Sequence, residues 1–263
     1  MHYFVGGAGD PLVLVHGLGG AAANWLPLAP LLLPGHCGSS PLPAAPSLNA
    51  FADRLAVAME REGFAPAPVV GHSLGGAIAL RLAIRRPDLV SALVLAGAAG
   101  ISSGRRSARY ALAVTGVLKP ARKIAPHRRL VARSAFLKRL VFGRWGAADP
   151  PALSPDVVEA FLAAPARHTD TVSAARALVG DDLRPDLDRV RCPSLVLWGA
   201  RDNQLSVEDA FDYARRLRAR LRVIADCGHL LIAERPEACA DAISEFLAGE
   251  PAAPPRLDRG AQI

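Results

Sequence analysis

One serine stands where a chain can present a nucleophile. Ser73 lies in Gly71-His72-Ser73-Leu74-Gly75, which fits the pattern G-x-S-x-G. The two glycines allow a strained turn between a strand and a helix, and this turn exposes the serine hydroxyl above the sheet. A glycine turn before a helix can also be only structural. The chemistry therefore depends on a base within hydrogen-bond reach and on an acid that orients the base.

Candidates for the base and the acid follow later in the chain. His229 comes directly after a Cys-Gly pair, on the loop that follows the last expected strand, and Asp202 follows the strand before it. The order serine, acid, histidine is one of the known orders of such triads. Asp202 could instead cap a surface helix, and Asp226 is a rival acid because it is so near His229 in sequence.

The other six histidines are given no catalytic role. His16 and His72 flank glycine turns, and we expect them to pack or to form hydrogen bonds. His36 lies in a Pro-Gly-His turn and could face a pocket. No motif surrounds the remaining three, which are His2, His127 and His168.

The glycines after the first strand could complete the site. An oxyanion formed in acyl transfer needs fixed backbone N–H donors, and the natural pair is Leu18, within His16–Gly20, and Leu74, after the serine. The same glycines could cradle a phosphate. However, the chain has no G-x-x-x-x-G-K-[ST] motif and no lysine before Lys119, so nucleotide binding is set aside.

Short apolar runs precede these residues and indicate strands. The runs are Pro11–Val15, Val69-Val70, Leu89–Ala96, Ser194–Leu197 and Leu221–Ala225. Helices are expected at Ala77–Arg86, from a capping-box-like Ser206 to about Arg218, and from Pro236 to about Leu247. This alternation predicts a parallel sheet with helices on both faces, with the candidate residues outside the carboxyl ends of the strands.

Composition excludes several classes of protein. The 263 residues are 51% hydrophobic and 21% charged, as in globular proteins, so a disordered, collagen-like or coiled-coil chain is excluded. The net charge is +7, but the segment from Gly100 to Ala148 holds twelve Lys or Arg and no acidic residue. This distribution disfavours nucleic-acid binding by the whole protein. An anionic surface facing the segment, or a coding bias toward arginine, stays open.

Cysteines and termini indicate a cytoplasmic protein. Cys37, Cys192, Cys227 and Cys239 form no CxxC pair or metal-ligand spacing, so we expect reduced thiols and no metal site. The N-terminus lacks the basic and apolar regions of a signal peptide, and no uncharged apolar stretch approaches ~18 residues.

The alternation stops between about Ile101 and Asp188, where helical composition broken by prolines predicts an inserted cap. Leu130, Leu137 and Val141 can share one helical face there. We expect this face to pack against the sheet domain, and peripheral contact with an anionic membrane is the less favoured alternative. The expected division is a core of 1–100 and 189–249, a basic cap of 101–188 and a disordered tail of 250–263.

Together these segments resemble the α/β-hydrolase superfamily, in particular serine-nucleophile members with a helical cap. The matching segments are PLVLVHGLGG with Asn24-Trp25, LPGHCGSS, VVGHSLGGAIALRLAIRRPDLVSALVLAGAAG, CPSLVLWGARD and CGHLLIAERPE. The resemblance implies that Ser73 is the nucleophile, Asp202 the acid and His229 the base.

The chain departs from the family pattern in two places. Only Leu26–Leu33 separate Trp25 from Pro34, eight residues where a helix and a strand would need roughly 17. Leu33 also stands where the family usually has an Asp at a strand end, and the N-terminus starts near the family's second strand. We therefore expect about six strands, with the first strand and one central strand missing or reduced, and a destabilised or oligomeric fold.

The expected activity is cleavage of a carboxylic ester or related acyl compound through an acyl-enzyme. The apolar cap predicts a small hydrophobic acyl substrate, its arginines could steer an anionic one, and the chemistry needs no metal or cofactor. Alternatives are carbon–carbon bond hydrolysis, lactone or thioester hydrolysis, acyl transfer, or a non-catalytic binding protein of the same fold.

Overall fold

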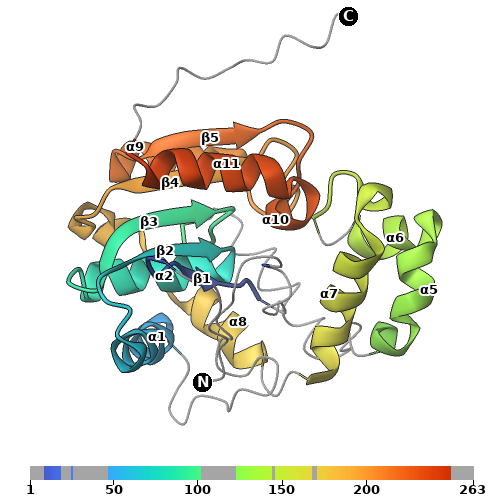
Figure 1. Cartoon of the computed structure of the whole chain (residues 1–263), viewed down its shortest axis with the longest axis horizontal. Helices are drawn as coiled ribbons and strands as arrows, with labels where there is room; N and C mark the ends of the chain where they lie inside the picture. The colour runs from blue at the N-terminus through green and yellow to red at the C-terminus, as the bar shows by residue number, and fades with distance from the viewer. Residues whose placement is uncertain are drawn as a thin grey trace, which may run out of the picture.

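A single parallel sheet forms the centre of the protein. The computed structural model describes residues 9–18, 25, 47–101, 123–143, 146–167 and 171–249. Within them the five strands lie in chain order (Figure 1): β1 (Val13–Val15), β2 (Ala67–His72), β3 (Val90–Ala96), β4 (Ser194–Gly199) and β5 (Arg220–Ile224). All five apolar runs thus form strands, and the predicted α/β fold with a parallel sheet is confirmed.

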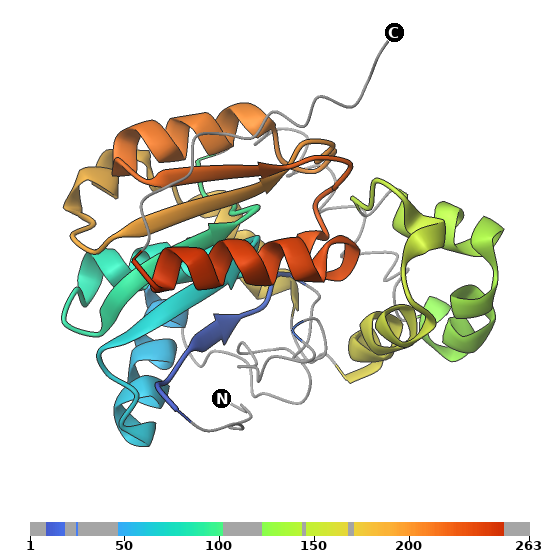
Figure 2. The same ribbon diagram turned by 45° about the horizontal axis from the view of Figure 1, so that its top comes forward.

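Helices cover both faces of the sheet. Side chains alternate between the two faces along each strand, and both sets are apolar, so both faces need to be buried. On one face Val69, Leu93 and Val196 belong to the main hydrophobic core. The helices of that core are α1 (Leu48–Glu62), α2 (Leu74–Arg85), α8 (Thr171–Gly180) and α9 (Val207–Leu217). On the other face Val70 and Val94 pack with α11 (Pro236–Leu247), which crosses in front of the strands in Figure 2.

The helix ends follow the sequence signals with one exception. Pro236 occupies the first turn of α11, and α2 ends just before Arg86 and Pro87, as predicted. Ser206 is the N-cap of α9, but its side chain makes no capping hydrogen bond. The predicted capping box is therefore wrong, since the N–H of Asp209 is bonded to the backbone oxygen of Ser206 at 3.0 Å.

The edge of the sheet at β1 is where the predicted loss of strands would be seen. β1 pairs with β2 in parallel, with Val13 opposite Val69, and no described residue pairs with the other edge of β1. The structure thus describes five of the about six strands expected. Leu26–Leu33, the first eight residues and the tail of 250–263 lie outside the described residues, so the predicted loss of a central strand stays a prediction.

Three helices form a separate layer beside the carboxyl ends of the strands (Figures 1 and 2). They are α5 (Arg128–Arg133), α6 (Ala135–Phe142) and α7 (Pro155–Arg167), with the short 3-10 turns η2 (Ala125–His127) and η3 (Pro150–Ala152). Their own core contains Val131, Phe142 and Val158, and Leu230 joins it from the sheet side. We call this layer the cap and propose that it spans residues 123–167.

The segment after α7 belongs with the sheet. Ala174 and Ala177 of α8 and Leu187 of η4 (Arg184–Arg189) lie in the main core together with the strands. Arg81 of α2 is buried and binds Asp181 and Asp186 at 2.7 Å each. This packing favours a cap that ends before residue 171 rather than at 188.

One predicted apolar face does not form. Val141 is buried and Leu137 is partly buried, but Leu130 is 62% exposed. The reason is a break at Ser134, whose extended backbone ends α5 and whose side chain accepts a hydrogen bond from the N–H of Leu137 as the N-cap of α6. Because the helical period restarts there, Leu130 does not share a face with Val141.

Candidate active site

The strand-to-helix turn holds Ser73 in a strained conformation. Ser73 lies between the end of β2 and the start of α2, with φ at 53°, in the left-handed region that non-glycine residues rarely adopt. A Cβ at Gly71 would come within 2.4 Å of the Gly75 oxygen, and one at Gly75 within 2.2 Å of the Val15 oxygen. The two glycines therefore permit this close packing, as the motif predicts.

The structure brings the three predicted residues together. The Oγ of Ser73 lies 3.0 Å from Nε2 of His229, and Nδ1 of His229 lies 2.8 Å from Oδ2 of Asp202. The side chain of Asp202 is fully buried and that of His229 is 10% exposed. A continuous chain of hydrogen bonds thus runs from a buried carboxylate to the serine hydroxyl.

Asp202 is held by its own loop. Its Oδ1 accepts the backbone N–H groups of Gln204 at 2.8 Å and Leu205 at 2.9 Å, which leaves Oδ2 for the imidazole. A carboxylate only accepts hydrogen bonds, so we assign the proton of neutral His229 to Nδ1. Nε2 is then the acceptor that faces the hydroxyl of Ser73.

The rival acid points elsewhere. Asp226 has a φ of 48° and pairs with Arg201 at 2.6 Å, and both side chains are exposed. Asp226 is therefore close to His229 in sequence, but its carboxylate is paired with Arg201 and not with the imidazole. Between the two carboxylates, the geometry selects Asp202.

His72 contacts His229, the predicted base. Its Nε2 lies 2.8 Å from the backbone oxygen of His229, and the two ring centres are 5.0 Å apart. Burial, and second the proximity of His229, lower the pKa of His72 from 6.5 to about 4. A neutral His72 can donate its Nε2 proton to that carbonyl, so the expected hydrogen-bonding role is confirmed.

The remaining histidines lie away from the hydroxyl of Ser73 or outside the description. His16 is buried, and its Nδ1 lies 2.8 Å from the oxygen of Gly17, as a hydrogen-bonding role predicts. His127 is exposed in the cap. The structure does not describe the other three, which are His2, His36 and His168.

The predicted oxyanion donors, Leu18 and Leu74, lie on the two segments next to Ser73 and stay a prediction. Leu74 is the first residue of α2, and no described residue accepts its N–H. Leu18 follows β1, in a loop so close to the turn that a Cβ at Gly17 would come within 3.0 Å of the Cβ of Ser73. An open N–H at a helix N-terminus favours negative charge, so this corner suits an oxyanion.

Glu234 is a residue that sequence reasoning missed. It is buried at the end of α10 (Leu231–Glu234), and its two oxygens accept the N–H groups of Gly228 at 3.1 Å and Ala148 at 2.7 Å. The N–H of His229 in turn donates to the oxygen of Gly146 at 2.5 Å. The loop of the base is thus fastened to the cap segment 146–148. In the sequence, only the position of this glutamate at the end of the apolar run LLIAE could have indicated that it is buried.

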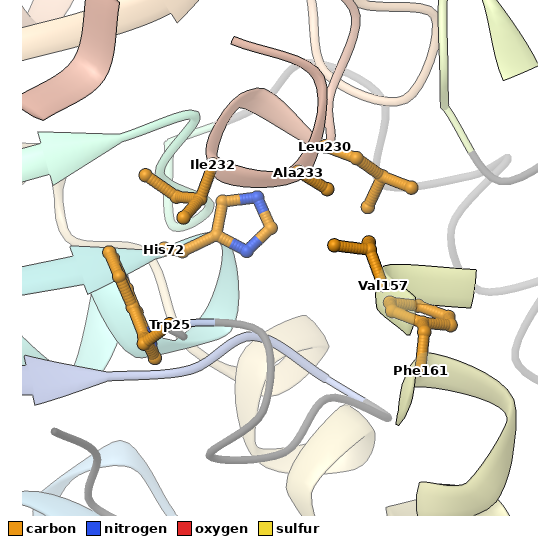
Figure 3. A pocket seen from close by; sticks show the side chains of 7 residues that line it. All are labelled: Trp25, His72, Val157, Phe161, Leu230, Ile232 and Ala233. Atoms are coloured by element: carbon orange, nitrogen blue, oxygen red, sulfur yellow. The ribbon is translucent and has the colours of Figure 1, made fainter. Parts of the chain in front are cut away.

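A pocket lies between the cap and the sheet (Figure 3), lined by His72 and Leu230, the sequence neighbours of Ser73 and His229, and by no side chain of the three predicted residues. Val157 and Phe161 project from α7, one helical turn apart, toward residues of the sheet side. His72 lies at its base, next to Ser73 in sequence, and no charged side chain lines it among the described residues. The other lining residues are Trp25, Ile232 and Ala233. The lining therefore favours apolar over charged groups, and the free volume of about 20 Å³ is about that of one water molecule.

Comparison with known proteins decides the family. A family model described as "alpha/beta hydrolase fold" matches residues 10–236. The chain belongs to the α/β-hydrolase family. Among its curated relatives, this α/β hydrolase is 32% identical over 238 residues to "Lipase LipV" of Mycobacterium tuberculosis, with 86% of each chain covered.

Other relatives of this α/β hydrolase differ in name. It is 30% identical over 267 residues to "2-hydroxymuconate semialdehyde hydrolase" of Pseudomonas sp. (strain CF600), with 94% of this chain and 90% of the relative covered. A solved structure of a thermophilic esterase from Thermogutta terrifontis matches with a TM-score of 0.71 at 25% identity, with 92% and 90% covered. The relatives support hydrolase activity on a small molecule, and the resemblance seen in the sequence is confirmed.

Proposed function

We propose that this α/β hydrolase is a serine hydrolase that cleaves a carboxylic ester or related acyl compound through an acyl-enzyme. The observation that carries the proposal is the chain of hydrogen bonds from Asp202 through His229 to Ser73. Both distances, from Asp202 to His229 and from His229 to Ser73, are within the range that proton transfer requires. The strained turn at Ser73 and the hydrogen bonds of His72 and Glu234 to the His229 loop support this geometry.

The proposed reaction has two halves. Nε2 of His229 accepts the Ser73 proton as Oγ attacks the acyl carbon, and the Leu18 and Leu74 amides stabilise the oxyanion. The carbon–oxygen bond to the alcohol then breaks, and His229 gives its proton to the leaving alkoxide. Water, deprotonated by His229, then attacks the acyl carbon; the bond to Oγ breaks, the acid leaves, and His229 returns the proton to Ser73. Asp202 keeps the imidazole oriented and stabilises its positive charge.

The proposed substrate is a small molecule with a hydrophobic group. The pocket lined by His72 and Leu230, which adjoin Ser73 and His229 in sequence, has aromatic and aliphatic side chains, and burial keeps the pKa of its histidine low. One curated relative bears the name of a lipase, and a solved relative is an esterase. These observations favour an uncharged apolar group in the pocket over a carboxylate.

Labelling with a fluorophosphonate probe tests the site without knowledge of the substrate. We expect label on Ser73 alone in the wild type, and no label after Ser73→Ala or His229→Ala. Mass spectrometry identifies the labelled peptide, and circular dichroism shows that each variant is folded. A folded wild type that takes no label would refute the proposed mechanism and favour a non-catalytic binding protein.

A second candidate is a different hydrolytic reaction at the same triad. The relative named as a 2-hydroxymuconate semialdehyde hydrolase favours this alternative. A panel of neutral esters, thioesters, lactones and dienone acids separates the candidates by kcat/KM. A preference for neutral esters supports the first proposal, and a preference for the dienone acid overturns it.

A further inference from the structure

The outer side of the cap exposes large apolar side chains. Phe136 is 71% exposed, Leu130 is 62% exposed and Leu140 is 58% exposed. Other exposed apolar side chains of the described residues, such as Phe211 of α9, are far from these three in sequence. We call these three residues, together with the exposed Arg129, Arg133 and Arg139 on the same helices, the cap outer face. Single exposed apolar residues are normal, but a cluster marks an interaction surface.

The helical geometry turns these side chains away from the rest of the protein. Phe136 and Leu140 are four residues apart on α6, so they share one face. The opposite side of α6 buries Val141 and Phe142, and α5 buries Val131 in the same cap core. In Figure 1 α5 and α6 form the outermost flank, with α7 between them and the sheet.

The apolar side chains alternate with exposed arginines. Arg129 and Arg133 lie one turn apart on α5, and Arg139 precedes Leu140 on α6. Arg129 approaches Glu159 only to 3.9 Å, with its side chain 77% exposed. Arg133 and Arg139 form no ion pair with any described residue. No acidic residue occurs from Gly100 to Ala148, so the positive charge of this face is not neutralised within its own segment.

We propose that the cap outer face docks on an anionic lipid bilayer. Exposed Phe and Leu side chains enter the boundary between headgroups and acyl chains, and arginines on the same face bind lipid phosphates. A stable protein interface needs about 800 Å² of well-fitted surface per partner, which three side chains do not provide. A lipid surface requires apolar side chains and positive charge but no shape complementarity. The inference does not depend on the catalytic proposal.

Vesicle sedimentation tests the docking. The full chain is mixed at low salt with vesicles of phosphatidylcholine alone, or of phosphatidylcholine with phosphatidylglycerol. We expect binding to the anionic vesicles only, and weaker binding as salt screens the arginines. Phe136→Ser lowers the partition coefficient about tenfold because it removes one inserted ring. Arg133→Gln lowers it about fivefold, the contribution of one charge at an anionic surface.

A matched substitution on the sheet domain serves as the control. Phe211→Ser removes a side chain that is 55% exposed on α9, so it is comparable in exposure to the cap residues, and we expect unchanged binding. Melting temperatures show whether each variant is folded.

Three results would overturn the proposal. One is no binding to anionic vesicles at low salt. A second is that Phe211→Ser reduces binding as much as Phe136→Ser does. The third is a dimer without vesicles, seen by light scattering and abolished by Phe136→Ser, which would show that a second copy of the chain covers this face.

Discussion

Replacement of Glu234 tests whether one buried carboxylate holds the base loop to the cap. Its oxygens accept two backbone N–H groups, from Gly228 and Ala148, and the residue is buried. A hydrogen bond to a charged group contributes about 1.5–3 kcal/mol. Glu234→Gln keeps one acceptor oxygen but turns an NH2 group toward the other donor. We therefore expect Gln to lower the free energy of unfolding by about 2–3 kcal/mol, and Ala by about 3–6 kcal/mol.

Urea denaturation followed by tryptophan fluorescence measures these losses. Glu237→Gln, three residues along and exposed on α11, is the matched control and should change stability by less than about 0.5 kcal/mol. Because Gly228 precedes the base, we also expect Glu234→Gln to lower kcat by about tenfold to 100-fold, as for a misplaced catalytic group. The reasoning is refuted if Glu234→Gln matches Glu237→Gln in both stability and kcat.

Further predictions concern Asp202 of the triad, the buried neutral His72 and the buried cation Arg81. Asp202→Asn should lower kcat by about 10⁴-fold with little change in KM, as neutralised triad acids do, and steady-state kinetics on an ester measures it. Since folding lowers the pKa of His72 from 6.5 to about 4, the unfolded chain binds the extra proton first as pH falls through this window. The free energy of unfolding should therefore fall by up to about 3 kcal/mol between pH 6.5 and 4, and urea titrations of His72→Gln should lack this component. Arg81→Ala leaves two carboxylates without their buried partner and should destabilise the fold by about 3–5 kcal/mol, measured by urea denaturation, and leave fluorophosphonate labelling intact.

Local signals were sufficient for the sheet and for the turn at Ser73. Apolar runs of valine and leucine placed all five strands, and the glycines around Ser73 predicted the turn, because both depend on neighbouring residues alone. The choice between Asp202 and Asp226 needed the structure. Asp226 has a positive φ and pairs with Arg201, and neither feature can be read from its distance to His229 along the chain.

Features that depend on distant contacts were not predictable. The bonds of Glu234 reach Ala148 across 86 residues, and nothing near Glu234 in sequence announces that partner. The exposure of Leu130 follows from the helix break at Ser134, where an N-cap serine competes with a continuous helix. Periodicity was applied across that break, so the predicted face was wrong.

The loops of the proposed acid and base are attached both to the sheet and to the cap. The nucleophile sits at the end of β2, whereas the N–H of His229 is bonded to Gly146 and the side chain of Asn203, next to Asp202, to Gly143. Acid and base loops are thus both tethered to the same stretch of the cap. A shift of that stretch would pull on both loops, while the bond from His72 to the backbone oxygen of His229 holds that loop beside Ser73. The position of the proposed base is thus set jointly by the sheet, through His72, and by the cap, through Gly146.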